Sequence, residues 1–300
     1  MKWFELSTRD VAFVAVFAAL SVIIIRFIPG FPIIGLSDSS IKFDAALAPI
    51  YGLVLGPYLG FLSAFIGGIV VANSGFSVLT SFSPAISALI AGLLTQRNYR
   101  SRSHSFPGWA MAAAVLGFLI LGWYATWVGQ GAPFYPVLHI FGLLAILVTR
   151  GWIATAFKKG KQKEKIWTAK PFYMLSGILI VVLAYILPKP YLSSVEFLPY
   201  LSLPLYFLGG IMIVYGLLDG DITKGNFAAT IWLASYCGII ADHMIGNLAY
   251  ITLFSPPPEL FMDVLPVSAV ERFIFTGIAT VIGVGLVLAL RRAGLFRREL

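Results

Sequence analysis

The sequence predicts an all-α membrane protein, a polytopic bundle of about ten transmembrane helices with both termini in the cytoplasm. Three observations support this prediction. The 300 residues are 59% hydrophobic and only 11% charged, whereas soluble domains carry about 25% charged residues. Long apolar segments recur along the chain, each close to the roughly 20 residues that a membrane-spanning helix needs. Basic residues gather in alternate connecting segments, as the positive-inside rule requires.

The chain contains ten candidate spans. The second and third are short and meet at Gly56-Pro57, a turn signal. The first follows a polar N-terminus and is too long for a signal-peptide core, so we expect it to be retained. The ten spans are 10–29, 43–56, 57–73, 77–95, 108–128, 137–157, 171–188, 201–219, 226–253 and 266–290.

The Lys and Arg residues set the predicted orientation. With the N-terminus inside, the inner segments are 1–9, the 56–57 turn, 96–107, 158–170, 220–225 and 291–300. These hold 16 of the 21 basic residues, while the outer segments hold only Lys42 and Lys189. The net charge of +8 is thus explained by topology, and no nucleic-acid partner is expected.

The segment 226–253 combines an apolar composition with chemically functional side chains. Asp242, His243 and Asn247 lie within the run, and ionisable groups inside a membrane helix are costly and indicate function. Trp232, Tyr236, His243 and Asn247 are separated by four, seven and four residues, which places them on one helical face. A helix–helix seam, with these groups paired internally, is the alternative interpretation.

Polar residues also collect at the predicted outer ends of the first four and last two spans. A structural seam would distribute them over all depths, whereas a one-sided cluster predicts an outward-open pocket with mostly apolar walls and a few polar groups. Trp232 and Tyr236 are expected to form its apolar floor. Interfacial anchoring at helix ends is the competing interpretation. The candidate substrate-binding residues are Asp44, Asn73, Trp232, Tyr236, Asp242, His243, Asn247, Glu271 and Arg272.

Opposite charges in this set predict ion pairs, because pairing is how buried charges are usually tolerated. Asp242 or Glu271 would neutralise Arg272, and Arg26 would pair with Asp44. A ligand carboxylate or phosphate could take the arginine instead, and His243 would suit a polar heterocycle. No metal or cofactor is expected, since the single cysteine, Cys237, excludes a Cys-based zinc site.

Small residues on the first span indicate a close helix contact. Ala15 and Ala19 form a small-xxx-small pair, with Ala12 beside them. Such pairs allow helices to approach closely in lipid. The contact is either with another helix of this chain or with a separate membrane subunit.

Several segments resemble the substrate-binding S components of energy-coupling factor (ECF) transporters. The stretch SIKFDAALAPIYGLVLGPYLGFLSAFIGGIV (40–70) is similar to the family's second and third helices. SPAISALIAGLLTQR (83–97) and PVSAVERFIFTGIATVIGVGLVLAL (266–290) resemble the following and the last helix. The alanine pair in the first span is similar to the motif by which S components contact the transmembrane T component.

The resemblance implies a six-helix core, residues 1–97 and 226–292, interrupted by an inserted four-helix block, 108–219, and followed by a basic cytoplasmic tail, 293–300. It also implies a binder of a vitamin or micronutrient, delivered inward with a T component and ATP-binding subunits in the cell membrane of a prokaryote. The sequence has no GxxxxGK[ST] phosphate loop, so ATP hydrolysis would come from partners.

Two further functions compete with this prediction. A self-sufficient secondary transporter, coupled to protons through Asp242, His243 or Glu271, is favoured by inverted repeats and broken helices, and neither is clear in the sequence. A membrane-embedded enzyme could use the same groups as acids and bases. The sequence has no HExxH or GxSxG motif, and we therefore predict that the chain is not an enzyme.

Overall fold

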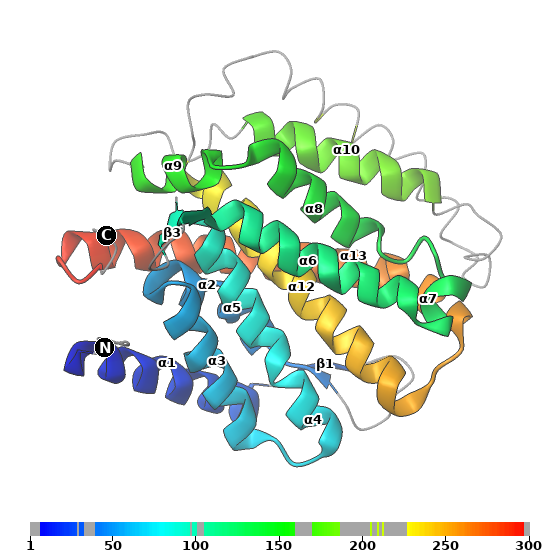
Figure 1. Ribbon diagram of the computed structural model, residues 1–300, viewed down its shortest axis with the longest axis horizontal. Coiled ribbons are helices and arrows are strands. Elements are labelled where there is room, and N and C mark those ends of the chain that lie inside the picture. The colour runs from blue at the N-terminus through cyan, green and yellow to red at the C-terminus, as the bar shows by residue number, and fades with distance from the viewer. Residues whose placement is uncertain are drawn as a thin grey trace.

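The computed structural model describes residues 7–28, 30–32, 40–96, 98–100, 105–159, 170–186, 205, 209, 212 and 227–296. Within these residues the chain forms a bundle of α-helices with two short antiparallel hairpins (Figure 1). The hairpins pair β1 (Phe31–Pro32) with β2 (Ser40–Ile41) and β3 (Asn98–Arg100) with β4 (Ser105–Pro107). Both lie in connecting segments, so the prediction of an all-α bundle is confirmed.

The bundle is built around α12 (Phe227–Phe254), which crosses the centre of the molecule (Figure 1). Every residue from Phe227 to Met244 is buried. A helix that is covered on all sides has no need of a polar stripe, and this one is apolar around its whole circumference apart from a few isolated polar groups. Helices α2, α5, α6, α8, α9 and α13 all pack against it.

Helices α1 to α5 form one side of the bundle. They are α1 (Thr8–Phe27), α2 (Asp44–Leu55), α3 (Pro57–Val71), α4 (Gly75–Thr80) and α5 (Phe82–Leu94). Ser7 and Asp10 form a capping box at the start of α1, which satisfies amide groups that the first turn leaves unpaired. Gly56 links α2 to α3 with a φ of 89°, a conformation that glycine adopts without a steric penalty.

The chain from 108 onward forms α6 (Gly108–Ala125), α7 (Trp127–Gly131), α8 (Val137–Thr149), α9 (Trp152–Lys159) and α10 (Lys170–Ile186). The expected continuous span 137–157 is instead broken, because α8 and α9 meet at a bend of 70°. At the break Arg150 has a φ of 44°, outside the helical region. The expected span 201–219 lies outside the described residues, except for three isolated positions.

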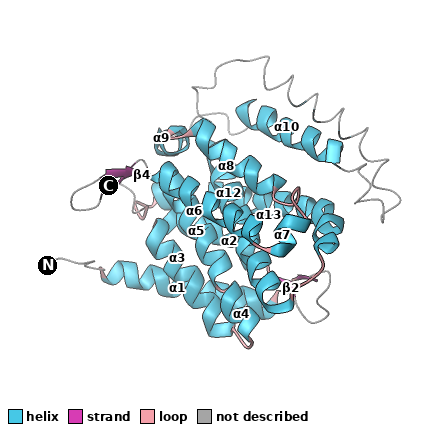
Figure 2. Cartoon of the chain, turned by 45° about the vertical axis from the view of Figure 1, so that its right-hand side comes forward, coloured by secondary structure: helices cyan, strands magenta, loops and turns pink. Residues whose placement is uncertain are grey.

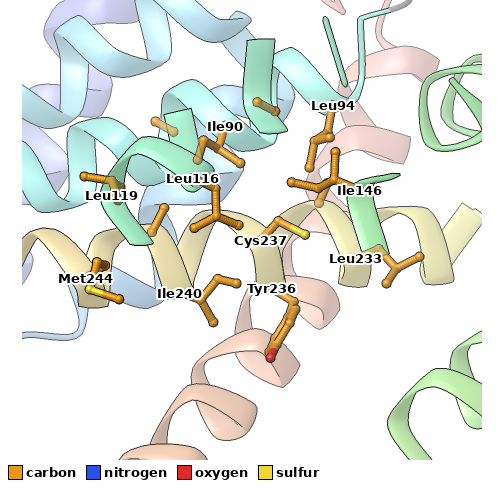
Figure 3. Close-up of a cluster of buried hydrophobic side chains, with 14 of the residues drawn as sticks. Ile90, Leu94, Leu116, Leu119, Ile146, Leu233, Tyr236, Cys237, Ile240 and Met244 are labelled. Carbon is orange, nitrogen blue, oxygen red and sulfur yellow. The ribbon is translucent and has the colours of Figure 1, made fainter. Parts of the chain in front are cut away.

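Helices α6 and α8 share one hydrophobic core with α5 and α12. Figure 3 shows Leu116 and Leu119 of α6 and Ile146 of α8 in one buried cluster with Cys237 and Ile240 of α12. These side chains are almost completely buried, so this part of the predicted inserted block packs directly against the predicted core. Helix α10 lies at the edge of the bundle (Figure 2).

The last helix begins earlier than expected. Helix α13 runs from Pro258 to Arg292 and includes residues 258–265, which the expected span 266–290 leaves out. Pro258 occupies the first helical positions and Glu259 the first turn, and both favour helix initiation. Glu271 and Arg272 therefore lie well inside the helix rather than near its first turn.

Five helices of the described part of the chain are long and apolar enough to cross a membrane when α4 and α5 are counted as one, Gly75–Leu94, or six if the bent α8–α9 pair is also one span. The shorter apolar helices α2 and α3 accompany them. Both ends of the chain lie at the same end of the bundle (Figure 1). Arg9, near the start of α1, donates a hydrogen bond to the carbonyl of Leu295, just beyond α13, which fixes the two ends beside each other.

Candidate functional site

A cavity of about 1050 Å³ lies at the end of the bundle opposite the termini. It is enclosed by the ends of α1 and α3, the starts of α2 and α5, the short α4, the second half of α12 and the first half of α13. Its lining consists of Ile25, Arg26, Lys42, Asp44, Ala45, Gly68, Val71, Ala72, Asn73, Ser74, Gly75, Phe76, Ser77, Thr80, Ser81, Ser83, Pro84, Tyr135, Asp242, His243, Gly246, Asn247, Tyr250, Leu253, Phe254, Leu260, Phe261, Val264, Val267, Ser268, Glu271 and Arg272.

An ion pair between neighbouring residues of α13 lies in this lining. The Arg272 Nη2 donates to the Glu271 Oε2 over 3.0 Å, and the side chains are 2% and 13% exposed. The pairing predicted for Arg272 with either Glu271 or Asp242 is therefore made with Glu271. Within the described residues, Glu271 Oε1 and Arg272 Nε have no hydrogen-bond partner. The ion pair therefore retains one acceptor and one donor that are not used within the protein.

Two buried carboxyl groups from other helices line the same cavity. Asp44 begins α2, and Asp242 lies on α12. Asp242 is 6% exposed, and its Oδ2 makes no hydrogen bond of normal geometry to any described residue. The predicted Arg26–Asp44 ion pair is absent, although both side chains line the cavity and both belong to the described part of the chain.

A hydrogen-bonded group of three residues joins the turn between α7 and α8 to α12. Tyr135 Oη lies 3.1 Å from His243 Nε2, and Asn247 Nδ2 donates to the same oxygen over 3.1 Å. All three residues line the cavity. Tyr135 was not among the predicted site residues. It stands in the loop sequence Ala-Pro-Phe-Tyr-Pro, and no helical spacing relates it to α12.

Aromatic side chains form one wall of the cavity. Phe76 of α4, Tyr250 and Phe254 of α12 and Phe261 of α13 all belong to the lining. Their ring centroids lie 5.4–6.5 Å apart in successive contacts, which is within the range of favourable edge and offset contacts. These rings, rather than the predicted pair on α12, provide the aromatic surface of the site.

Seven of the nine predicted substrate-binding residues are brought together around the cavity: Asp44, Asn73, Asp242, His243, Asn247, Glu271 and Arg272. Trp232 and Tyr236 are not in its lining, and their interpretation as its floor is wrong. Their rings stack on each other at 5.2 Å, and the Tyr236 hydroxyl donates to the Leu138 carbonyl of α8. They lie about two turns or more nearer the termini on a helix that is buried all round, so their shared face meets other helices.

The buried charged side chains lie on one side of the bundle with one exception, whereas other buried polar residues, such as Thr95, Thr230 and Ser235, lie outside the cavity lining. Asp10 is 1% exposed and lies at the end that carries the termini, where it completes the cap of α1. The other buried charged side chains of the described residues, Asp44, Asp242 and Arg272, all line the cavity. Within the described ranges, no group of three or more His, Cys, Asp and Glu is arranged to hold a metal ion.

The fold and the cavity thus define a multi-pass helical membrane protein with a solute-sized cavity at one end, lined by both apolar and polar residues. Residues 5–135 match the family model described as the ECF-type riboflavin transporter, S component. The resemblance to an ECF S component is confirmed by this match, which continues past residue 108 through α6 and α7 to Tyr135. The matched family consists of transporter subunits and is not a family of enzymes.

A protein of Methanocaldococcus jannaschii that is described as uncharacterized is also similar to this chain. The two are 27% identical over 214 residues, which cover 68% of this chain and 65% of that protein. The chain therefore spans about two thirds of the length of this relative. No solved structure matches the chain.

Proposed function

We propose that this chain is the membrane-embedded substrate-binding subunit of a vitamin or micronutrient uptake transporter in a prokaryotic cell membrane. The observation that carries this proposal is the convergence of seven predicted polar residues on one cavity of about 1050 Å³, at the end of the bundle opposite the termini. Small-molecule sites are hollows of roughly this size, with apolar and aromatic walls and a few placed polar groups.

The chemistry of the lining favours a planar heterocyclic ligand. Phe76, Tyr250, Phe254 and Phe261 offer ring surfaces, on which a flat ring system could stack. His243 and Asn247 supply hydrogen-bonding groups close to these rings, and one Asp242 oxygen has no hydrogen-bond partner among the residues that the structure describes. Riboflavin is the first compound to test, because the family model that matches residues 5–135 is named for it.

Inward delivery would require partners. The sequence has no phosphate-binding GxxxxGK[ST] loop, so a T component and ATP-binding subunits would supply ATP hydrolysis. Ala15 and Ala19 are exposed on α1, whereas Val14, Phe17 and Ala18 face the bundle. The small-residue pair is therefore available for a contact outside the described part of this chain, as expected of a face that docks another membrane subunit.

Binding is tested directly by titrating riboflavin into the purified chain in mild detergent. We expect saturable quenching of flavin fluorescence, reduced at least tenfold in affinity by His243→Ala or Arg272→Ala, with Arg150→Ala as an exposed control. Mass spectrometry of small molecules released from the purified protein covers other heterocycles. Release of lipid alone, with no heterocycle, would contradict the proposal.

A self-sufficient secondary transporter remains a second candidate because of one observation. Asp44 and Asp242 are buried carboxyl groups that line the cavity, and such groups carry protons in membrane transporters. One uptake experiment distinguishes the two candidate functions. Uptake by liposomes that contain this chain alone favours the secondary transporter, whereas uptake that requires co-purified ATP-binding subunits favours the S component.

A further inference from the structure

The hydroxyl of Tyr135 is the meeting point of a buried hydrogen-bond chain. Tyr135 lies in the turn between α7 and α8 and is 1% exposed. Its Oη accepts a hydrogen bond from Asn247 Nδ2 and lies 3.1 Å from His243 Nε2. His243 and Asn247 are one turn apart on α12, so a single phenol spans two polar residues of the cavity lining.

The number of protons on these groups determines which atom donates and which accepts in each of these hydrogen bonds. The Asn247 amide already donates to the Tyr135 oxygen, and a phenol has one proton to donate in return. When that proton goes to His243 Nε2, this ring nitrogen must be an acceptor, and a neutral imidazole then carries its hydrogen on Nδ1. With the hydrogen bonds in this direction, Tyr135 selects one tautomer of His243, whose Nδ1 has no hydrogen-bond partner among the described residues, and one orientation of the Asn247 amide.

Tyr135 is itself held rigidly. Its ring stacks on Trp123 of α6 at 4.8 Å and meets the edge of Phe261 of α13 at 5.1 Å. The Trp123 Nε1 donates to the carbonyl of Ala132, which anchors the turn that carries Tyr135. On the far side, the His139 ring of α8 stacks on His243 at 5.3 Å. The hydroxyl is therefore placed by α6, α8 and α13 together.

We propose that Tyr135 is a positioning residue that determines the specificity of the cavity by fixing the His243 tautomer and the Asn247 amide. The fixed amide leaves the Asn247 Oδ1 and a second amide hydrogen for a ligand, a pattern that complements a ring bearing both an acceptor and a donor. The turn after α7 thus contributes to ligand recognition, although it belongs to neither α12 nor α13. The claim about ligand specificity rests on the proposed function, whereas the claim that Tyr135 positions His243 and Asn247 does not.

The positioning claim is tested without a ligand. Ring-nitrogen NMR of ¹⁵N-histidine-labelled protein is simple to assign, because the chain has three histidines and His243→Gln removes one signal pair. We expect wild-type His243 to be protonated at Nδ1 and its Nε2 signal to shift in Tyr135→Phe. Tyr236→Phe is the matched control, since it removes another buried hydroxyl, one that bonds the Leu138 carbonyl. An unchanged His243 signal in Tyr135→Phe, or a proton on Nε2 in the wild type, would overturn the claim.

The specificity claim is tested with riboflavin as the probe. Tyr135→Phe should weaken binding about tenfold, the effect of one lost hydrogen bond of about 1.4 kcal/mol, while Tyr236→Phe stays within about twofold of the wild type. Equal affinities of Tyr135→Phe and the wild type would refute it. If the wild type itself does not bind riboflavin, the flavin part of the proposed function fails, and the NMR measurement still decides whether Tyr135 positions His243.

Discussion

At the scale of single residues, Arg272 is the side chain whose burial most needs an explanation. It is 2% exposed and paired with Glu271. A buried ion pair contributes little net stability, but removing one partner leaves an uncompensated charge that costs about 3–5 kcal/mol. An intramembrane charge that serves no structural purpose would be expensive to retain, which supports a role for this pair in the cavity that it lines.

The cost of an unpaired charge gives a prediction for this pair. Arg272→Met should lower the thermal stability of the detergent-solubilised protein strongly, because the mostly covered Glu271 side chain then loses its partner. The double variant Glu271→Gln, Arg272→Met should recover much of the loss, since neither member of the pair then carries a charge. Melting curves of the two variants check this. Equal instability of both would show that packing, rather than charge, accounts for the effect.

At the scale of elements, helices α2 and α5 pack backbone to backbone. A Cβ at Gly52 of α2 would lie 1.9 Å from the carbonyl oxygen of Ala88 and 2.8 Å from the amide nitrogen of Gly92, both on α5. Neither neighbour is a flexible side chain that could move aside. Close approach through glycine is a common way for membrane helices to gain packing energy, and here it holds the wall of α2 and α5 beside α12.

This contact predicts an asymmetry between two glycine substitutions. Gly52→Ala should destabilise the protein by about 1–3 kcal/mol or more, as overpacking does. Gly285→Ala in α13 adds a Cβ that meets nothing within 4 Å, and it should be neutral or slightly stabilising because alanine favours helix. The apparent melting temperatures of the two variants provide the measurement. A similar loss in both would argue against the close α2–α5 approach.

The exposed face of α1 predicts a separation between folding and assembly. Ala15→Trp with Ala19→Trp should leave the melting temperature of the isolated chain nearly unchanged, because both positions are exposed. The same change should abolish co-purification with a T component, since bulky residues prevent close helix approach. Val281→Trp, at an α13 position that is 67% exposed, is the control. Unimpaired co-purification of the alanine variant would exclude this face as the docking surface.

At the scale of the whole molecule, the bundle is polarised along its length. The hydrogen bond between Arg9 and the Leu295 carbonyl marks one end, and the cavity marks the other. Near the first end, Arg291 donates to the Phe157 carbonyl over 2.7 Å and lies over the Phe227 and Phe296 rings. Basic side chains at this end are what the positive-inside rule expects of a cytoplasmic face.

The predicted orientation can be measured by cysteine labelling. The native Cys237 is completely buried, so it should give little background. Gly75→Cys, at an exposed position where a Cβ has no neighbours, should react with an impermeant maleimide in intact cells. Ala293→Cys, exposed beside the C-terminal end of α13, should react only after permeabilisation. The reverse pattern would place the cavity on the cytoplasmic side.

The sequence by itself determined the class of this protein and the end of the bundle where most of its candidate site residues gather. Hydropathy and the energetic cost of charge in lipid act on each segment separately, so spans such as 10–29 and 226–253 correspond to α1 and α12 without knowledge of their neighbours. The same local cost singled out Asp44, Asp242 and Arg272 as candidate site residues, and all three line the cavity.

The tertiary structure decided which side chains meet. Because α12 is buried on every side from Phe227 to Met244, its sequence carries no periodic signal that distinguishes one face from another, and the spacing of Trp232 and Tyr236 does not reveal that both lie outside the cavity lining. Tyr135 reaches His243 from 108 residues away in sequence through the packing of Trp123 and Phe261. Such contacts depend on the rotation and docking of several helices, and spacing within one segment cannot specify them.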